Sequence, residues 1–298
     1  MNLFDQLVTQ ALANQRALSP LRVVVEKELL HHDILREMAD ADLLSRLTFI
    51  GGTCLRACYG SNRLSEDLDF TGGADFQREH LQTLGQVLVE RLQVKYGLGV
   101  EVSEPQRETG NVDTWKLRVI THPEQKHLPM QRINIDICAI PSYEPRPTVL
   151  RNHYAVDMGT SGLILQVESR AEILADKLVA FALRPNRIKN RDLWDIAWLR
   201  QQAVDTPLAL VAKKIADHKQ TVEQFITQMD QRMQQLLTDD GVRVDFLHEM
   251  RRFLPPDVVT RTVENPAFWD YLRNTLEEEC QRVMRFLRQD GTTNVFRM

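Results

Sequence analysis

Hydrophobic residues near the N-terminus recur with the spacing of an α-helix. Through LRVVVEKELLHHDILREMADADLL (21–44) the apolar positions return at helical intervals, so the first 45 residues are predicted to be helical. The pattern then changes to the short apolar run LTFI (47–50). This run ends in a glycine pair, which indicates a buried strand stopped by a turn. Residues 53–59 come next as a short predicted helix.

Strand patterns dominate the next hundred residues, around one helix predicted at 76–96. The clearest strand is QRINIDICAI (131–140), in which isoleucines alternate with polar residues. The other predicted strands are 67–70, 98–104, 114–121 and 163–168. Pro141, Pro145 and Pro147 indicate a linker-like stretch. Because strands and helices do not alternate regularly, we expect a mixed sheet with flanking helices.

From Ser169 onward the pattern is almost wholly helical. Ser169 and Glu172 fit a capping box in front of the apolar segment EILADKLVAFAL. Further helices are predicted at 191–203, 207–217, 221–237, 243–254 and 267–289. The sequence therefore predicts an α+β fold, with a first domain over residues 1–168 and an all-helical C-terminal domain over residues 169–298.

Composition narrows the class of protein. The chain has 298 residues, of which 43% are hydrophobic, enough for two domains with cores of their own. The net charge is -4, which excludes a uniformly basic nucleic-acid binder. No apolar run is long enough for a membrane span and no signal peptide is evident, so we expect a cytoplasmic protein. Its four cysteines are expected to be free thiols: Cys54, Cys58, Cys138 and Cys280.

The segment FIGGTCLRACYGSNRLSEDLDF (49–70) carries the most specific pattern in the chain. A strand leads to Gly51 and Gly52, which allow the backbone to approach a ligand closely. Thr53 is placed to cap the next helix, whose free N–H groups would then face an anion. A turn of this kind suits the phosphates of a nucleotide. Two glycines alone are usually only a turn, so the prediction depends on the acidic residues further along the segment.

Carboxylates complete this pattern. Asp67 and Asp69 alternate along a predicted strand, so both face the same side while Leu68 enters the core. Asp136, on the strand at 131–140, projects opposite its isoleucines. If the two strands are neighbours, the three carboxylates can hold two Mg²⁺ or Mn²⁺ ions for phosphoryl transfer. An isolated Asp-x-Asp is usually a solvated strand end, and only the joint pattern is specific.

A second informative segment is EILADKLVAFALRPNRIKNRDLWDIAWL (172–199). Lys177 lies away from the helix face that packs, where it can reach a triphosphate or simply be a solvated surface lysine. Four basic residues then form the densest positive patch of the chain: Arg184, Arg187, Lys189 and Arg191. Asp192 and Asp195 open the next helix, where acidic residues also favour the helix dipole.

These residues together resemble the AbiEii/AbiGii-type toxins, also called MenT toxins, within the DNA polymerase β-like nucleotidyltransferase superfamily. The similarity covers roughly residues 45–200 and is carried by "EILADKL", "RDLWD" and a set of residues in the first motif. That set is Gly51, Gly52, Thr53, Leu55, Arg56, Tyr59, Arg63, Ser65, Asp67, Asp69 and Phe70. The last hundred residues share only a helical character with the family.

The resemblance implies a nucleotidyltransferase-type sheet and a reaction. Asp67, Asp69 and Asp136 would be metal ligands, and Lys177 would bind the triphosphate. Asp192 would orient or deprotonate the acceptor hydroxyl as a general base. The nucleotide-binding set would be Gly51, Gly52, Thr53, Arg63, Lys177, Lys189 and Arg191. The substrate would be an NTP (ATP, GTP, CTP or UTP), and the acceptor a tRNA 3′ end.

Growth arrest, phage defence and an AbiEi-like antitoxin partner are also implied by the resemblance.

Alternative functions remain open at this point. The same site can transfer a nucleotide to a protein hydroxyl, and a glycosyltransferase can use Asp-x-Asp with a metal, although it does not need the glycine turn. A helical binding module with an inactive site is the non-enzymatic alternative.

Overall fold

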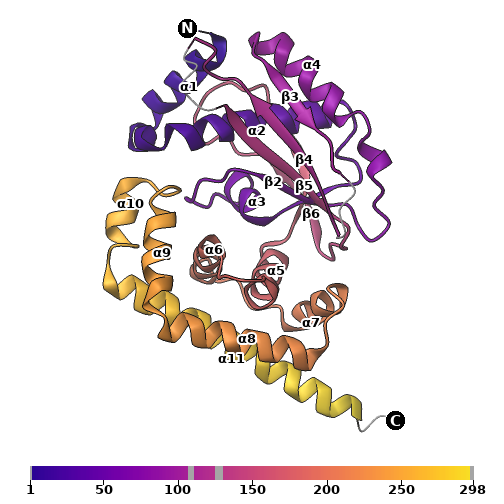
Figure 1. Cartoon of the computed structure of the whole chain (residues 1–298), viewed down its shortest axis with the longest axis vertical. Coiled ribbons are helices and arrows are strands. Elements are labelled where there is room, and N and C mark those ends of the chain that lie inside the picture. The colour runs from indigo at the N-terminus through magenta and orange to yellow at the C-terminus, as the bar shows by residue number, and fades with distance from the viewer. Residues whose placement is uncertain (1, 107–110, 125–129, 296–298) are drawn as a thin grey trace. The chain divides into compact units, whose positions relative to one another are not determined.

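The computed structural model describes residues 2–106, 111–124 and 130–295 (Figure 1). The chain divides after Glu168 into two compact units. The change coincides with the end of the last strand and the start of a helix at Arg170. Each unit is described by itself.

The first unit begins with three consecutive helical elements, where the sequence predicts continuous helix. They are α1 (Leu3–Asn14), the 3₁₀ helix η1 (Arg16–Leu21) and α2 (Arg22–Asp40). Pro20 lies in η1, and because proline cannot donate the backbone hydrogen bond of an α-helix, the α-helical segments are separated here. Most of α2 is buried, including several charged and histidine side chains.

A seven-stranded mixed sheet forms the centre of this unit, in the order β3-β4-β5-β2-β1-β7-β6. Its strands are β1 (Thr48–Ile50), β2 (Leu68–Thr71), β3 (Val100–Ser103), β4 (Val112–Val119), β5 (Gln131–Cys138), β6 (Pro145–Val149) and β7 (Ile164–Glu168). Two strand pairs are parallel, β2 with β5 and β1 with β7, and the others are antiparallel. The predicted mixed sheet with flanking helices is confirmed.

The linker-like interpretation of Pro145 and Pro147 is wrong. Both prolines lie in β6, which is the last strand of the sheet and pairs with β7 alone. Proline is tolerated on an edge strand because its missing N–H can face away from the neighbouring strand. The strand is therefore compatible with the prolines that made its sequence look like a linker.

Helices α2 and α4 pack together beside the strands of the first unit, α2 against β5 and α4 against β3. The helix predicted at 76–96 is a 3₁₀ turn, η2 (Arg78–Leu81), followed by α4 (Leu84–Tyr96). Its last turn ends at Gly97, which adopts the left-handed conformation with φ 64°. The remaining helix, α3 (Gly51–Ala57), packs against β1 and β2.

The second unit is helical throughout its described residues. The helices are α5 (Arg170–Leu183), α6 (Asn190–Gln201), α7 (Leu208–Asp217), α8 (Val222–Thr238), α9 (Asp240–Met250), α10 (Pro256–Arg261) and α11 (Pro266–Val295). The side chain of Ser169 accepts a hydrogen bond from the Glu172 N–H, as expected of a helix cap. Short α10 is absent from the predicted helices.

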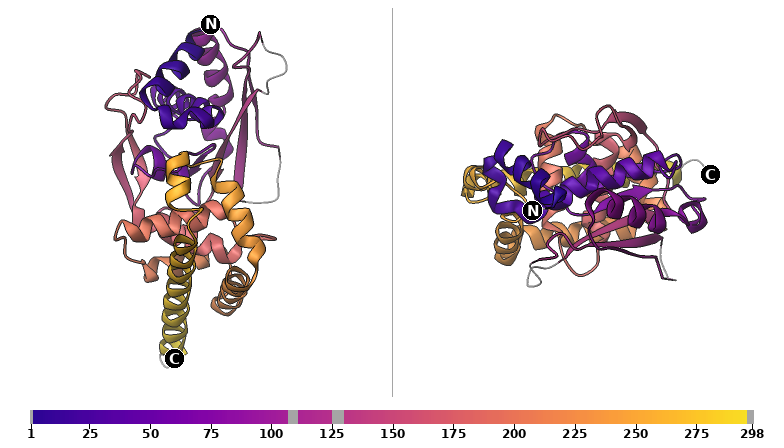
Figure 2. Two further views of the ribbon diagram at one scale, coloured as in Figure 1. Left: turned by 90° about the vertical axis from the view of Figure 1, so that its left-hand side faces the viewer. Right: turned by 90° about the horizontal axis from the view of Figure 1, so that it is seen from above.

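Helix α5 is central to the second unit, since α6, α7 and α8 all pack against it. The last helix, α11, runs unbroken along α6 and α8, and it is the long yellow helix in the left view of Figure 2. Among the residues that the structure describes, none of the helices combines the length and apolarity needed to cross a bilayer.

Candidate active site

Gly51 and Gly52 follow β1 directly and are the first two residues of α3. Gly51 has φ 75°, a left-handed conformation that favours glycine. A Cβ atom at this position would lie 3.0 Å from Oδ2 of Asp69. The turn therefore approaches one of the predicted metal-binding carboxylates so closely that there is little room for a side chain.

The predicted capping role of Thr53 is wrong. Helix α3 starts at Gly51 with Ile50 as its N-cap residue, so Thr53 lies inside the helix. Its side chain is buried and turns away from the helix start: Oγ1 is 2.6 Å from Oγ of Ser65 and donates a hydrogen bond to the Asp67 carbonyl. Thr53 thus connects α3 to the segment that leads into β2.

The aspartates lie on neighbouring strands, as the two-strand hypothesis requires. Asp69 in β2 and Asp136 in β5 are register partners, and partners in a parallel pair face the same side. Leu68 is fully buried, which agrees with the predicted alternation. Asp67 comes just before β2, and its Oδ1 accepts a hydrogen bond of 3.0 Å from the Asn134 N–H.

These donor atoms suit a divalent cation in their chemistry. Carboxylate oxygens are the ligands that Mg²⁺ and Mn²⁺ prefer, and two carboxylates in register repel each other unless a cation or a donor lies between them. On the other side of Asp136 from Asp69, Thr114 of β4 donates from Oγ1 to Oδ1 of Asp136 over 2.6 Å. Within the described residues no group of three or more His, Cys, Asp or Glu side chains is arranged to hold a metal ion. The three-carboxylate site stays a prediction.

A buried polar network joins α2, α3 and Tyr154, and the sequence analysis did not predict it. The Glu28 carboxylate binds Nε of Arg56 at 3.1 Å and accepts a hydrogen bond from the Tyr154 hydroxyl. Burial by itself raises the pKa of Glu28, but the Arg56 charge and the Tyr154 hydrogen bond bring this pKa below its ordinary value. Glu28 is therefore a buried, ionised carboxylate.

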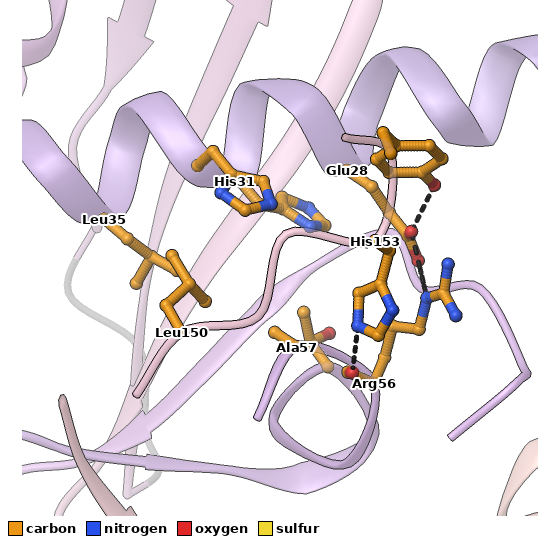
Figure 3. Close-up of a pocket in the computed structure, with 10 residues that line it drawn as sticks. Glu28, His31, Leu35, Arg56, Ala57, Leu150 and His153 are labelled. Carbon is orange, nitrogen blue, oxygen red and sulfur yellow. Dashed lines mark hydrogen bonds and ion pairs between the residues drawn. The ribbon is translucent and has the colours of Figure 1, made fainter. Parts of the chain in front are cut away.

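The network borders a small cavity whose lining includes His31, His32 and His153 (Figure 3). Its volume, about 20 Å³, is room for a water molecule. Burial lowers the pKa of all three histidines, that of His32 to about 4, so they are neutral at physiological pH. The sequence signal that could have found this network is a run of polar residues on the buried face of α2.

Arg63, predicted to bind the nucleotide, is buried in the first unit. Its side chain donates a hydrogen bond of 2.9 Å to the Leu64 carbonyl. This contact is consistent with a structural role in the loop between α3 and β2. Its proposed contact with nucleotide stays a prediction.

In the second unit, Lys177 is not the solvated surface lysine that was its simplest interpretation. It is buried on α5, and its Nζ lies 2.6 Å from Oδ1 of Asp192 and 3.1 Å from Oδ2 of Asp195, both on α6. Burial raises the pKa of Asp192, but the charges of Lys177, Lys189 and Arg184 outweigh it and lower this pKa to about 2. The cluster brings Lys177 and Asp192 together as an ion pair, and the roles predicted for them in the reaction stay predictions.

The basic residues near this cluster have partners within the same unit. Arg184 lies 3.3 Å from Oδ2 of Asp192. Arg191 pairs with Glu249 at 3.2 Å, and its guanidinium lies 4.8 Å from the centre of the Phe253 ring. Lys189 is the N-cap residue of α6. The patch is thus part of the packing between α6 and α9 as well as a candidate for phosphate contacts.

Comparison with known proteins identifies the family of the chain. Residues 33–274 match the family model of the nucleotidyl transferase AbiEii toxin, which is part of a type IV toxin–antitoxin system. The chain belongs to this family. The match extends well beyond the motif region, into the helices that resembled the family only in character. A comparison with curated proteins finds no significant match.

Two solved structures, from two bacteria, align with most of this chain. MenT4, a nucleotidyltransferase toxin from Mycobacterium tuberculosis H37Rv, aligns with a TM-score of 0.55 and 17% identity over 94% of this chain and 98% of that chain. JHP933 from Helicobacter pylori aligns with a TM-score of 0.45 and 17% identity over 91% and 99% of the two chains. At this identity, the likeness to MenT4 shows a shared fold.

Proposed function

We propose that this chain transfers a nucleotide from an NTP to an RNA hydroxyl, with the tRNA 3′ end as acceptor. The hydroxyl oxygen attacks the α-phosphorus and forms a new P–O bond. The bond from the α-phosphorus to the β-phosphate oxygen breaks, pyrophosphate leaves with that electron pair, and the hydroxyl proton passes to a base or to solvent. Family membership supports the reaction class.

The observation that carries the location of the site is the close approach of Gly51 to Asp69, the register partner of Asp136. Backbone groups of Gly51, Gly52 and Thr53 would contact the phosphates, because the Thr53 hydroxyl is committed to Ser65 and to the Asp67 carbonyl. Asp67, Asp69 and Asp136 would hold Mg²⁺ or Mn²⁺, which supplies positive charge to the phosphates during transfer.

The roles proposed for the second unit are those that the family implies. Lys177 would bind the triphosphate, with Lys189 and Arg191 assisting. Arg63, in the first unit, is a further residue proposed to bind the nucleotide. Asp192 would orient or deprotonate the acceptor hydroxyl. The Lys177–Asp192 ion pair would then have to exchange partners when substrate binds.

Purified full-length protein, each α-labelled NTP and total tRNA test this function, with Mg²⁺ or Mn²⁺ supplied. Sequencing of RNA 3′ ends identifies the added nucleotide and the acceptor. Asp67→Ala and Asp69→Ala should abolish labelling, while Glu101→Gln, an exposed carboxylate on β3 of the same sheet, should leave it unchanged. Unchanged labelling in the aspartate variants refutes the site.

Label in protein instead of RNA would favour the alternative acceptor, a protein hydroxyl.

The family also supports a partner. We propose an AbiEi-like antitoxin that acts with this toxin in the cytoplasm. Co-expression of the neighbouring gene product should relieve growth arrest caused by the wild-type chain.

A further inference from the structure

Residues 65–67 form a short connection into β2 that belongs to neither a helix nor a strand. Ser65 is buried and Glu66 and Asp67 are partly buried, so their backbone N–H and C=O groups need partners outside the regular ladders. Here the partners are side chains. The Ser65 N–H donates to Oε1 of Glu28 over 2.9 Å, and the Asp67 carbonyl accepts from Thr53.

The middle of this segment is held by His31. Its Nε2 lies 3.0 Å from the Glu66 carbonyl oxygen, and because a carbonyl only accepts, Nε2 carries the proton. Lys27 binds the side chain of the same residue, with Nζ 2.9 Å from Oε1 of Glu66. Lys27, Glu28 and His31 are spaced to lie on one face of α2. One face of α2 therefore holds the segment that contains Asp67.

The far end of the segment is fixed to β5. Asp67 Oδ1 accepts the Asn134 N–H, two residues before Asp136. The contacts run from α2 through Ser65 and Glu66 to Asp67, and from there to β5, the strand that carries Asp136. A small shift of this segment would turn the Asp67 carboxylate away from its present direction.

We propose that His31 is a positioning residue, which holds the Ser65–Asp67 segment through the Glu66 carbonyl and so sets the direction of the Asp67 carboxylate. The consequence for catalysis rests on the proposed function, since it requires Asp67 to take part in the transfer. The effect of His31 on the position of the segment does not depend on the proposed function.

Three full-length variants separate positioning from simple packing. His31→Leu keeps an apolar side chain of similar size but removes the donor to Glu66. His31→Gln restores an N–H donor near the position of Nε2. The matched control is His32→Leu, because His32 is similarly buried but its Nδ1 forms a hydrogen bond of 2.8 Å with Thr160, which lies outside the segment.

The first measurement is hydrogen exchange of peptides that cover residues 62–68, without nucleotide or metal. Exchange in His31→Leu should be about fivefold faster than in His32→Leu, the factor that corresponds to one net hydrogen bond. His31→Gln should exchange like the wild type. Equal exchange in the two leucine variants overturns the proposal.

The second measurement is the labelling reaction. His31→Leu should lower kcat by about 10- to 100-fold, the usual effect of removing a group that orients a ligand, with little change in KM for the NTP. His31→Gln should recover most of the rate. Faster exchange with an unchanged rate in His31→Leu would show that the direction of Asp67 does not matter, and would overturn the catalytic half.

Failure of the proposed function gives a different result. If the wild type labels neither RNA nor protein with any NTP, the exchange experiment alone decides whether His31 holds the segment. If Asp67→Ala abolishes labelling while His31→Leu behaves like His32→Leu in both measurements, only the positioning inference fails.

Discussion

Replacement of Gly51 by alanine tests the close approach of the glycine turn to Asp69. An L-residue in the left-handed conformation costs about 1–2 kcal/mol relative to glycine. Gly51 has φ 75°, so alanine would carry this cost. Its Cβ would also lie 3.0 Å from Oδ2 of Asp69, a contact that forces the carboxylate to shift by a few tenths of an ångström.

Gly97→Ala is the matched control for this change. Gly97 has φ 64°, at the end of α4, and an added Cβ there meets no atom within 4 Å. Both variants should therefore lose about 1–2 kcal/mol of stability. For a unit of this size that corresponds to a fall in Tm of about 2–4 °C per kcal/mol. Only Gly51→Ala also displaces a carboxylate.

Thermal unfolding and nucleotide labelling measure the two effects separately. We expect similar Tm values for the two variants, and a labelling rate that falls in Gly51→Ala by about 10- to 100-fold, as for a displaced catalytic group. Gly97→Ala should label like the wild type. Equal labelling by both variants would refute the reasoning, because it would mean that the contact between the turn and Asp69 has no part in the reaction.

Three further predictions concern buried charges. Lys177→Met leaves Asp192 and Asp195 without their shared cation. We expect the free energy of unfolding, measured by chemical denaturation, to fall by about 3–5 kcal/mol. A fall below about 1 kcal/mol would contradict the buried ion pair. The pKa of Asp192 is lowered to about 2 in the folded state, so ionised Asp192 contributes roughly 2 kcal/mol to the free energy of unfolding. This contribution is complete above the unfolded pKa of about 3.9 and is lost as the pH falls toward 2. The stability of Asp192→Asn, measured by acid titration, should not show this loss. Lys214→Met should destabilise the helical unit by a similar amount, about 3–5 kcal/mol, because Nζ of Lys214 lies 2.7 Å from buried Glu172, and an unchanged melting curve would argue against that pair.

The parts of the fold that can be predicted are those with a local signal. Strand β5 is predictable because Ile133, Ile135 and Ile137 alternate with polar residues, and all three isoleucines are buried. Strand β6 escapes prediction because proline is a local signal for a loop, whereas its tolerance in β6 depends on the position of that strand at the edge of the sheet. An edge position is a property of the whole sheet and leaves no trace in a short segment.

In the candidate site, too, the predictable features are those with a local sequence signal. The Gly51 turn and the carboxylates of Asp69 and Asp136 are predictable from a short motif and an alternating strand, provided that the two strands are assumed to be neighbours. The contact of His31 with Glu66 joins residues 35 positions apart, and no periodicity predicts which backbone carbonyl a buried histidine meets. The role of Thr53 is not predictable in this way, because its hydroxyl has a partner, Ser65, that only the folded chain brings near.

The prolines of β6 also bear on how the protein behaves when it accumulates. An open sheet edge is a template on which the strand of another molecule can add. Pro145 and Pro147 are two residues apart, so their missing donors point in the same direction, and pairing with β7 requires that direction to be outward. At Pro145 and Pro147 the outer edge then offers carbonyl oxygens without the N–H groups that a second strand needs. The two prolines therefore make this edge a poor template for the same strand of another copy of the chain.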